Sequence, residues 1–268
     1  TVQWVVLAYL LTVTTLLLSV GRLADMIGKK SIYAAGFAVF TLSSVLCGLA
    51  PTVYWLVGFR VLQALGAAMI MALGTAMVTE AFPSSERGKA LGIFGTLVSI
   101  GIIAGPTIGG ILLESFTWHW LFFVNLPVGI LGVFLVARFV PDSRPGTKQH
   151  FDLPGAIILF VSLCYLLFSL SLIQSGGFSN PLTFILLVVF AITLVVFIIH
   201  ETRAPEPMID LTMFKNRLFT VNLVTGFSTF VVTAGTMIIL PIYLQNVLQF
   251  GPRQTGLMMA VTPLMVAF

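Results

Sequence analysis

Arg60 and Gln63 are the residues of this chain best suited to chemistry inside an apolar environment. They lie three positions apart within the apolar run 53–79, so their side chains share one face of a helix. A cation inside a membrane span costs free energy unless it meets a partner or water, and by default it marks a functional site. The alternative is an arginine that extends its head group to the membrane interface.

We expect Arg60 to tune proton exchange on a carboxyl group. A fixed cation within about 4–6 Å lowers the pKa of a carboxyl group, whereas burial alone raises it. Movement of Arg60 toward or away from such an acid would bind and release a proton on opposite sides of a membrane. Because Glu80 and Glu114 lie only at the ends of apolar runs, we expect the acid in helices beyond this sequence.

A second pattern is a short polar stretch between two apolar runs. It reads Gly-Arg-Leu-Ala-Asp-Met-Ile-Gly-Lys-Lys over residues 21–30, and its two glycines permit a tight turn. A loop this short cannot move independently, so the helices that it joins should move as a hairpin. An ordinary positively charged cytoplasmic loop is the alternative. The candidate gating residues are Gly21, Leu23, Asp25, Gly28, Lys29 and Lys30.

A third pattern is a glycine repeat in the apolar run 90–113. Glycines recur every four residues from position 101, which leaves a smooth helix face for close packing, and a proline in the same run bends the helix. Helix packing alone is the alternative. We expect leucine at Gly105 or Gly109 to be more damaging than leucine at Gly36. The candidate residues are Gly101, Gly105, Pro106, Gly109 and Gly110.

No pattern in the chain indicates enzyme chemistry. Gly28-Lys29 lacks the glycine that a phosphate-binding loop carries five residues earlier, and no Gly-x-Ser-x-Gly nucleophile motif occurs. The histidines lack metal-ligand spacing and are expected to be isolated interfacial residues. They are His119, His150 and His200. We therefore expect no enzyme, no catalytic residue, no metal and no cofactor.

The composition places all these residues in a membrane. Only 13 Lys and Arg and 9 Asp and Glu occur in 268 residues, 8% of the chain, and 58% of residues are hydrophobic. Soluble domains carry about 25% charged residues, so a soluble enzyme, a disordered chain and a secreted disulfide scaffold are excluded. Cys47 and Cys164 each lie in an apolar run. The net charge of +4 is read as basic loops that orient the spans, and no nucleic-acid partner is expected.

The spacing of the charges predicts eight complete transmembrane helices and a truncated ninth. A helix needs about 20 apolar residues to cross the hydrocarbon core, whereas barrel strands would alternate over about 10 residues. Helices six and seven are divided by the breaker run 174–181. The predicted spans are 2–20, 31–50, 53–79, 90–113, 119–139, two within 153–199, 219–247 and a ninth from 255.

Basic residues predict the orientation of the spans. Eleven of the 13 Lys and Arg lie in the loops after spans one, three, five and seven, and such loops face the cytoplasm. Thr1 is therefore expected at the external face of a multi-pass plasma-membrane protein. Because the chain opens without Met and ends within an apolar run, we expect a fragment with one further helix upstream.

These motifs together resemble the major facilitator superfamily. Residues 21–30 are similar to its signature loop, with Lys29 in place of arginine and Met26 where the family has a cation. The stretch 60–68 is similar to its second motif, with Ala64 replacing a glycine. Residues 101–110 resemble its antiporter motif. In the family the loop aspartate, here Asp25, contacts the other half of the transporter when the cytoplasmic side is closed.

Further stretches, 118–129, 151–155 and 205–217, resemble the fourteen-helix drug–proton antiporters of the EmrB/QacA type. The resemblance implies an all-α integral membrane helical bundle of the major facilitator type. It implies three regions: an N-terminal bundle at 1–139 without its first helix, a cytoplasmic linker with an inserted helix pair at 140–200, and a truncated C-terminal bundle at 201–268.

The resemblance implies a secondary transporter that exports organic, drug-like compounds in exchange for protons by alternating access. The proton gradient supplies the energy, and the transporter is expected to be a monomer in the lipid bilayer. A metabolite facilitator or importer and a non-transporting membrane sensor are the alternatives. Each candidate cavity residue could equally be a helix–helix hydrogen bond. These candidates are Tyr9, Gln63, Asn222 and Gln245.

Overall fold

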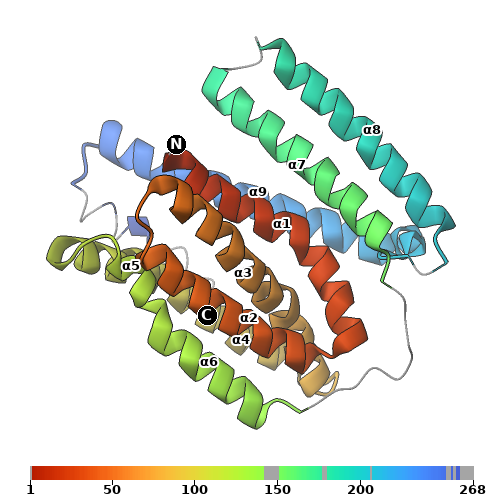
Figure 1. The fold of residues 1–268 in the computed structure, drawn as a ribbon, viewed down its shortest axis with the longest axis horizontal. Helices are drawn as coiled ribbons and strands as arrows, with labels where there is room; N and C mark the ends of the chain where they lie inside the picture. The colour runs from red at the N-terminus through yellow and green to blue at the C-terminus, as the bar shows by residue number, and fades with distance from the viewer. Residues whose placement is uncertain are drawn as a thin grey trace. The chain divides into compact units, whose positions relative to one another are not determined.

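The computed structural model describes residues 2–141, 151–176, 180–205, 207–251, 255 and 258–259 (Figure 1). These residues form helices, turns and extended connections, and no β-strand occurs among them. Most of the ninth predicted span lies outside the described residues, as do the loop cations Arg144, Lys148 and Arg253 and the histidine His150.

The helices follow the predicted spans closely, with three differences. The first helix continues seven residues beyond its predicted end, the fifth is divided at Val124, and a short 3-10 helix, η2, precedes the last one. The helices are α1 Val2–Ile27, α2 Lys29–Gly48, α3 Val53–Ala81, α4 Arg87–Ser115, α5 Trp120–Phe123, α6 Asn125–Phe139, α7 Leu153–Gly176, α8 Pro181–Arg203, η2 Leu211–Lys215 and α9 Arg217–Asn246.

Local sequence explains where the later helices begin. The Asn180 side chain accepts a hydrogen bond from the Leu182 N–H at 3.0 Å, and Pro181 stands at the first helical position of α8. Asn216 accepts from the Leu218 N–H at 3.0 Å in the same way at the start of α9. Both arrangements satisfy N–H groups that have no partner within the helix.

The described helices have the length and surface of membrane spans. Seven of them are long and apolar enough to cross a membrane, and large apolar side chains such as Phe134, Val188 and Phe227 are exposed on them. A soluble surface rarely carries so many exposed apolar groups, and such a surface is typical of helices in a membrane. The all-α membrane fold is confirmed. α4 has 29 residues, and because some of its side chains lie outside the described set, the fourth span stays a prediction.

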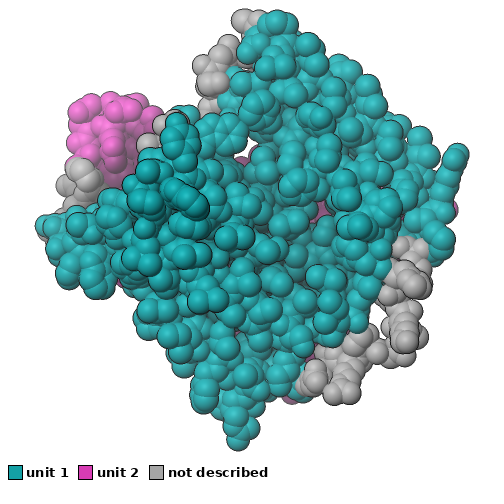
Figure 2. Space-filling model, in the orientation of Figure 1, with its two compact units in different colours: residues 1–77, 112–209 teal, residues 78–111, 210–268 magenta. Residues whose placement is uncertain are grey.

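Two compact units are formed by the chain (Figure 2). The first, teal in Figure 2, contains residues 1–77 and 112–209, and the second, magenta, contains residues 78–111 and 210–268. In the first unit α7 and α8 lie side by side, α7 also contacts α1, and α2 contacts α1, α5 and α6. The three regions predicted from the sequence, with limits at 139 and 200, stay a prediction.

Glycine allows α2 and α3 to approach closely in the first unit. A Cβ atom added to Gly36 would lie 2.7 Å from the Cβ of Met69, and one added to Gly66 would lie 2.8 Å from the Gly36 carbonyl oxygen and would also overlap the backbone of Phe40. Real Cβ atoms do not come so close to other heavy atoms. Gly36 is therefore a tightly packed position itself, and the expected order of damage to transport at the three glycines stays a prediction.

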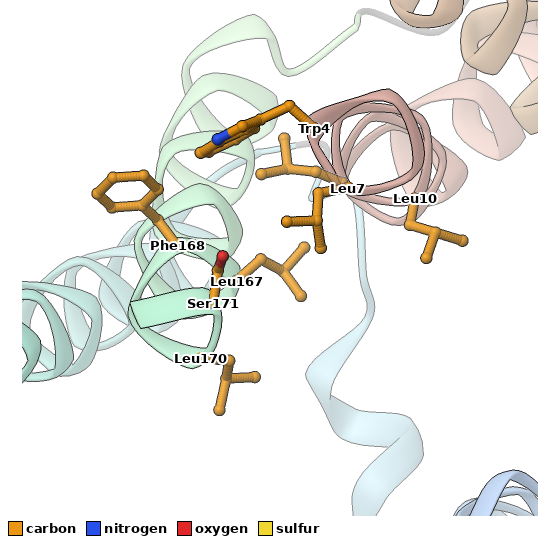
Figure 3. A pocket seen from close by; sticks show the side chains of 8 residues that line it. Trp4, Leu7, Leu10, Leu167, Phe168, Leu170 and Ser171 are labelled. Carbon is orange, nitrogen blue, oxygen red and sulfur yellow. The ribbon is translucent and has the colours of Figure 1, made fainter. Parts of the chain in front are cut away.

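The contact between α1 and α7 leaves an apolar crevice of about 180 Å³ (Figure 3). The rings of Trp4 and Phe168 lie 5.9 Å apart at one side of it. Leucines from both helices form most of its wall, and Ser171 adds a hydroxyl group. Tyr9, Gln63, Asn222 and Gln245 are not among the residues that line this crevice.

Candidate functional site

A buried polar network connects three helices around Gln63. The Arg60 guanidinium donates to Gln63 Oε1 at 3.1 Å, and Gln63 Nε2 donates to Ser44 Oγ at 3.0 Å. Asn125 Nδ2 donates to the same hydroxyl oxygen at 3.0 Å, and Ser44 Oγ donates to the Phe122 carbonyl oxygen at 2.9 Å. The network therefore joins α3 to α2 and to the junction of α5 and α6.

Ser44 is the centre of this network. Its side chain is fully buried and Gln63 is 1% exposed. A hydroxyl group has one donor and two acceptor sites, and Ser44 uses all three. An unpaired polar group costs free energy in a buried apolar environment. Because every hydrogen-bonding site of Ser44 is occupied, separating α2 from α3 or from the junction of α5 and α6 would leave such a group.

Arg60 is held between two aromatic rings as well as by Gln63. Its guanidinium carbon lies 5.3 Å from the ring centre of Tyr9 on α1 and 4.8 Å from that of Phe122. Both distances are within the range of cation–π attraction. Arg60 Nε is buried and has no hydrogen-bond partner among the described residues, so this donor of the cation is unused.

The geometry brings two of the predicted cavity residues, Tyr9 and Gln63, together with Arg60. In the part of the chain that the structure describes, no carboxylate forms an ion pair with Arg60. The site thus consists of a fixed cation, an amide and an aromatic ring in an apolar surrounding. Such a site can attract an anionic or proton-accepting group, or stack against a planar molecule.

The signature loop is mostly helical. Gly21 and Leu23 lie within α1, and the turn to α2 is made by Gly28 alone, with φ 112° and ψ 129°. Only glycine adopts this conformation readily. The expectation that Gly21 helps to form the turn is therefore wrong, whereas that for Gly28 is confirmed. Lys30 follows Lys29 in the first turn of α2.

Asp25 lies on the exposed side of this turn. Its carboxylate is 52% exposed and lies 3.4 Å from the Lys29 ammonium, one helical turn further on. An exposed pair of this kind contributes about 0–1 kcal/mol. Leu23, by contrast, packs against the buried apolar cluster that includes Ile32 of α2 and Ala68 of α3. Its leucine therefore anchors the loop more than its ion pair does.

The glycine repeat lies in α4, as predicted. A Cβ atom added to Gly101, Gly105 or Gly110 meets no other described atom within 4 Å. Gly109 lies on the same helix, and the side chain of Pro106 lies outside the described set. The packing role of these residues, and that of Pro106 as a bend, stay predictions.

The other two predicted cavity residues lie on α9. Asn222 and Gln245 are both exposed and belong to the second unit, whereas Tyr9 and Gln63 belong to the first. Pro241 lies within the same helix, four residues before Gln245. That all four residues line one cavity stays a prediction.

Comparison with known proteins gives the family. The model of the Major Facilitator Superfamily matches residues 1–268. This chain belongs to that superfamily. It is a family of transporters, which agrees with the absence of enzyme motifs in the sequence.

Several bacterial transporters are similar to this superfamily member. It is 38% identical over 266 residues to the riboflavin transporter RibZ of Clostridioides difficile, covering 99% of the chain and 57% of RibZ. It is 35% identical over 267 residues to multidrug resistance protein 3 of Bacillus subtilis, covering 98% of the chain and 51% of that protein. It is also 35% identical over 257 residues to multidrug resistance protein Stp of Mycobacterium tuberculosis, covering 96% of the chain and 48% of Stp. The chain spans about half the length of the curated relatives it matches.

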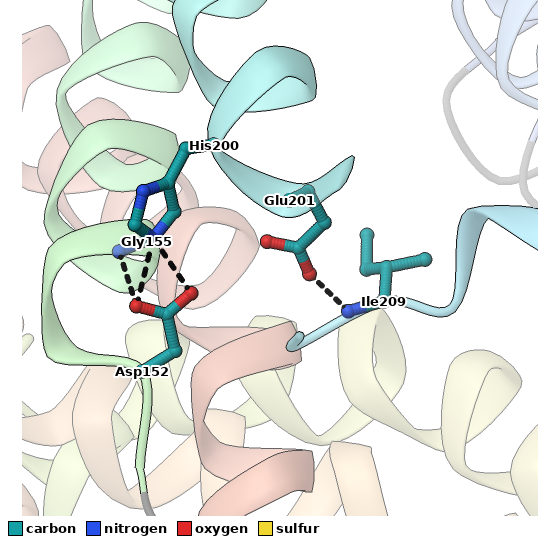
Figure 4. Close-up of polar contacts among 5 residues, drawn as sticks. All are labelled: Asp152, Gly155, His200, Glu201 and Ile209. Atoms are coloured by element: carbon teal, nitrogen blue, oxygen red, sulfur yellow. Dashed lines mark hydrogen bonds and ion pairs between the residues drawn. The ribbon is translucent and has the colours of Figure 1, made fainter. Parts of the chain in front are cut away.

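Sequence reasoning missed two groups of polar residues in this transporter chain. Ser44 and Asn125 are 81 positions apart, and neither stands out in its apolar run. His200, expected to be isolated, lies with Nε2 3.0 Å from both carboxylate oxygens of Asp152 (Figure 4). Asp152 Oδ1 also accepts the Gly155 N–H at 3.0 Å. The only sequence signal for this pair was the helix-start pattern at 152–155.

Proposed function

We propose that the full-length protein is a secondary active exporter of organic, drug-like compounds that exchanges them for protons by alternating access. Membership of the superfamily and the two multidrug resistance relatives support export of this class of compound. The match of residues 101–110 to the antiporter motif supports exchange. The proton gradient is the energy source, and the protein acts as a monomer in the plasma membrane.

We assign the protein to the fourteen-helix branch of the superfamily. Helices α7 and α8 form a membrane-length pair directly after the N-terminal helices, at the place where shorter members have a cytoplasmic linker. The segment between them, 177–180, carries no charged residue. A hairpin of two apolar helices with a neutral external connection supports an inserted transmembrane pair.

The observation that carries the proposal is the environment of Arg60. Its guanidinium group is held by Gln63 and two aromatic rings, yet no described carboxylate pairs with it. A cation kept in an apolar interior without a counter-charge has an electrostatic reason to meet a titratable acid during the transport cycle. Proton exchange on that acid would then couple to the movement of the helices.

Efflux of a fluorescent organic cation tests this proposal. The full-length protein, expressed in cells that lack their own exporters, should lower the intracellular dye signal, and a protonophore should abolish the difference. In inverted vesicles an imposed pH gradient alone, acid inside, should drive dye uptake. Dye movement that is unchanged by the protonophore and by the imposed pH gradient would refute proton exchange.

A second candidate function follows from the 38% identity to a riboflavin transporter. A facilitator or importer would move riboflavin or a similar planar metabolite down its own gradient. Radiolabelled riboflavin uptake without a pH gradient, together with no dye efflux, would favour it. Binding of either compound without movement in vesicles would favour a membrane sensor instead.

A further inference from the structure

The segment that follows α8 contacts the helices that carry the signature loop. Residues 207–209, called the strap below, belong to the first unit. They come shortly after α8, which ends at Arg203. Met208 is 8% exposed. It lines a groove of about 430 Å³ with Leu17, Leu18, Gly21, Arg22 and Asp25 of α1 and Met71, Ala72 and Thr75 of α3.

A buried glutamate holds the strap in this position. Glu201, in the last turn of α8, is 3% exposed, and its Oε1 accepts a hydrogen bond from the Ile209 N–H (Figure 4). Its second oxygen, Oε2, is buried and has no partner among the described residues. Carboxyl groups are almost never fully buried without a strong reason, and here the reason is the backbone of the strap.

The helix end that carries Glu201 is itself fixed. His200 contacts Asp152 at 3.0 Å, and Asp152 also bonds to the first turn of α7 through Gly155 (Figure 4). Asp152 is therefore joined to both helices of the inserted pair. The helix end that precedes the strap is thus held by these contacts. Met208, the middle residue of the strap, lies in the groove without filling it.

We propose that Glu201 is a positioning residue that keeps Met208 in the groove of α1 and α3, so that the inserted helix pair responds to movement of the signature loop. This coupling rests on the alternating access of the proposed function. Methionine is unbranched and adapts to irregular surfaces, so its contact persists while two packed helices slide by small steps. A rigid side chain in a filled pocket would instead resist the movement.

Disulfide cross-linking in the full-length protein tests the contact. Met208→Cys with Thr75→Cys, in a protein without other cysteines, should join rapidly on mild oxidation in membranes. The control pair is Met208→Cys with Leu62→Cys, since Leu62 lies on α3, is 46% exposed and does not line the groove. Absence of a cross-link in the first pair, or equal rates in both pairs, would overturn the contact.

Variants of Glu201 test the anchor. Glu201→Ala should slow the cross-linking about tenfold, which corresponds to about 1.4 kcal/mol. Glu201→Gln keeps a carbonyl oxygen that can accept the Ile209 N–H, so its rate should stay within about twofold of the parent protein. An unchanged rate in Glu201→Ala, or an equal loss in both variants, would overturn the role of this hydrogen bond.

A change in the signature loop tests the coupling without any substrate. Asp25→Asn should slow the cross-linking of Met208→Cys with Thr75→Cys at least about threefold, because under the proposed function the Asp25 carboxylate holds the closed cytoplasmic state, and its loss displaces α1 beside the strap. The control Glu86→Gln changes an exposed charge outside the groove and should leave the rate unchanged. An unaltered rate in Asp25→Asn would overturn the coupling, whereas failure of dye efflux in the parent protein would overturn the proposed function alone.

Discussion

Replacement of Gln63 by leucine should loosen the first unit, because Gln63 hydrogen-bonds to both Arg60 and Ser44 in the described network. Leucine has nearly the same length but no polar atoms. The change removes the acceptor that Arg60 uses and one of the two donors that reach Ser44. The Asn125–Ser44 bond at 3.0 Å remains, so the network is cut at one defined place.

The expected magnitude follows from the two lost bonds. A hydrogen bond between membrane helices, such as Gln63 to Ser44, contributes about 0.6 kcal/mol on average and at most about 1.7 kcal/mol. A bond to a charged group, such as Arg60 to Gln63, contributes about 1.5–3 kcal/mol. The free energy of local opening should therefore fall by about 2–5 kcal/mol in Gln63→Leu.

Cys47 provides a local probe for this opening. Its side chain is fully buried, and Sγ lies 3.8 Å from Gln63 Oε1. In a full-length protein with no other cysteine, a maleimide reagent can reach it only when the surrounding helices separate. Since about 1.4 kcal/mol is a factor of ten, labelling in Gln63→Leu should be about 30- to 4,000-fold faster than in the parent protein.

Two comparisons make this prediction decisive. Gln245→Leu, an equal change at an exposed position of α9, should alter Cys47 labelling by less than about threefold. In a Ser44→Ala background the effect of Gln63→Leu should shrink, because one of its bonds is already absent. Labelling of Gln63→Leu within about threefold of the parent would refute the argument that the network holds these helices together.

Three further predictions concern transport and packing. Asp25→Asn should leave membrane insertion intact and slow export strongly, because under the proposed function its carboxylate holds the closed cytoplasmic gate. Normal dye efflux would show that the loop only sets the topology. The Arg60→Lys variant should export with a shifted pH optimum, since lysine keeps the charge but lacks the planar guanidinium group. The Arg60→Ala variant should bind dye without proton-driven exchange, and normal export by it would refute the coupling role of Arg60. Gly36→Leu should lower the thermal stability of the protein, because no space exists for the leucine side chain. Gly105→Leu should lower transport and leave the stability unchanged. The reverse pattern would contradict a packing role for Gly36 and a transport role for Gly105.

The helices were predictable because each depends on a local property of the sequence. Charges separate the apolar runs, and Asn180 with Pro181 marks the start of α8 from sequence alone. The first helix was predicted too short, since its last two turns carry Arg22 and Asp25. Polar residues end a membrane span but not a helix. α1 continues to Ile27, and the chain leaves helical geometry at Gly28, where φ is positive.

The site was predictable only in part. Arg60 and Gln63 stand out because each is polar within an apolar run, and their spacing places them on one face. Ser44 and Asn125 carry no such signal, because serine and asparagine occur in many membrane helices and gain significance only from their neighbours. The close contact of Gly36 with α3 was likewise invisible, since a single glycine in a helix shows no repeat.

Polar groups in a membrane helix can be recognised one at a time, but whether each is satisfied depends on pairs that the fold creates. Ser44 has all its hydrogen-bonding sites occupied, whereas Arg60 Nε and Glu201 Oε2 are buried without a partner among the described residues. Water cannot supply partners in the hydrocarbon core, so such unpaired groups are costly there. A saturated group such as Ser44 fixes one arrangement of helices. An unsaturated group is stabilised when a movement brings it a partner, so Arg60 and Glu201 are the groups through which the alternating access proposed above would act.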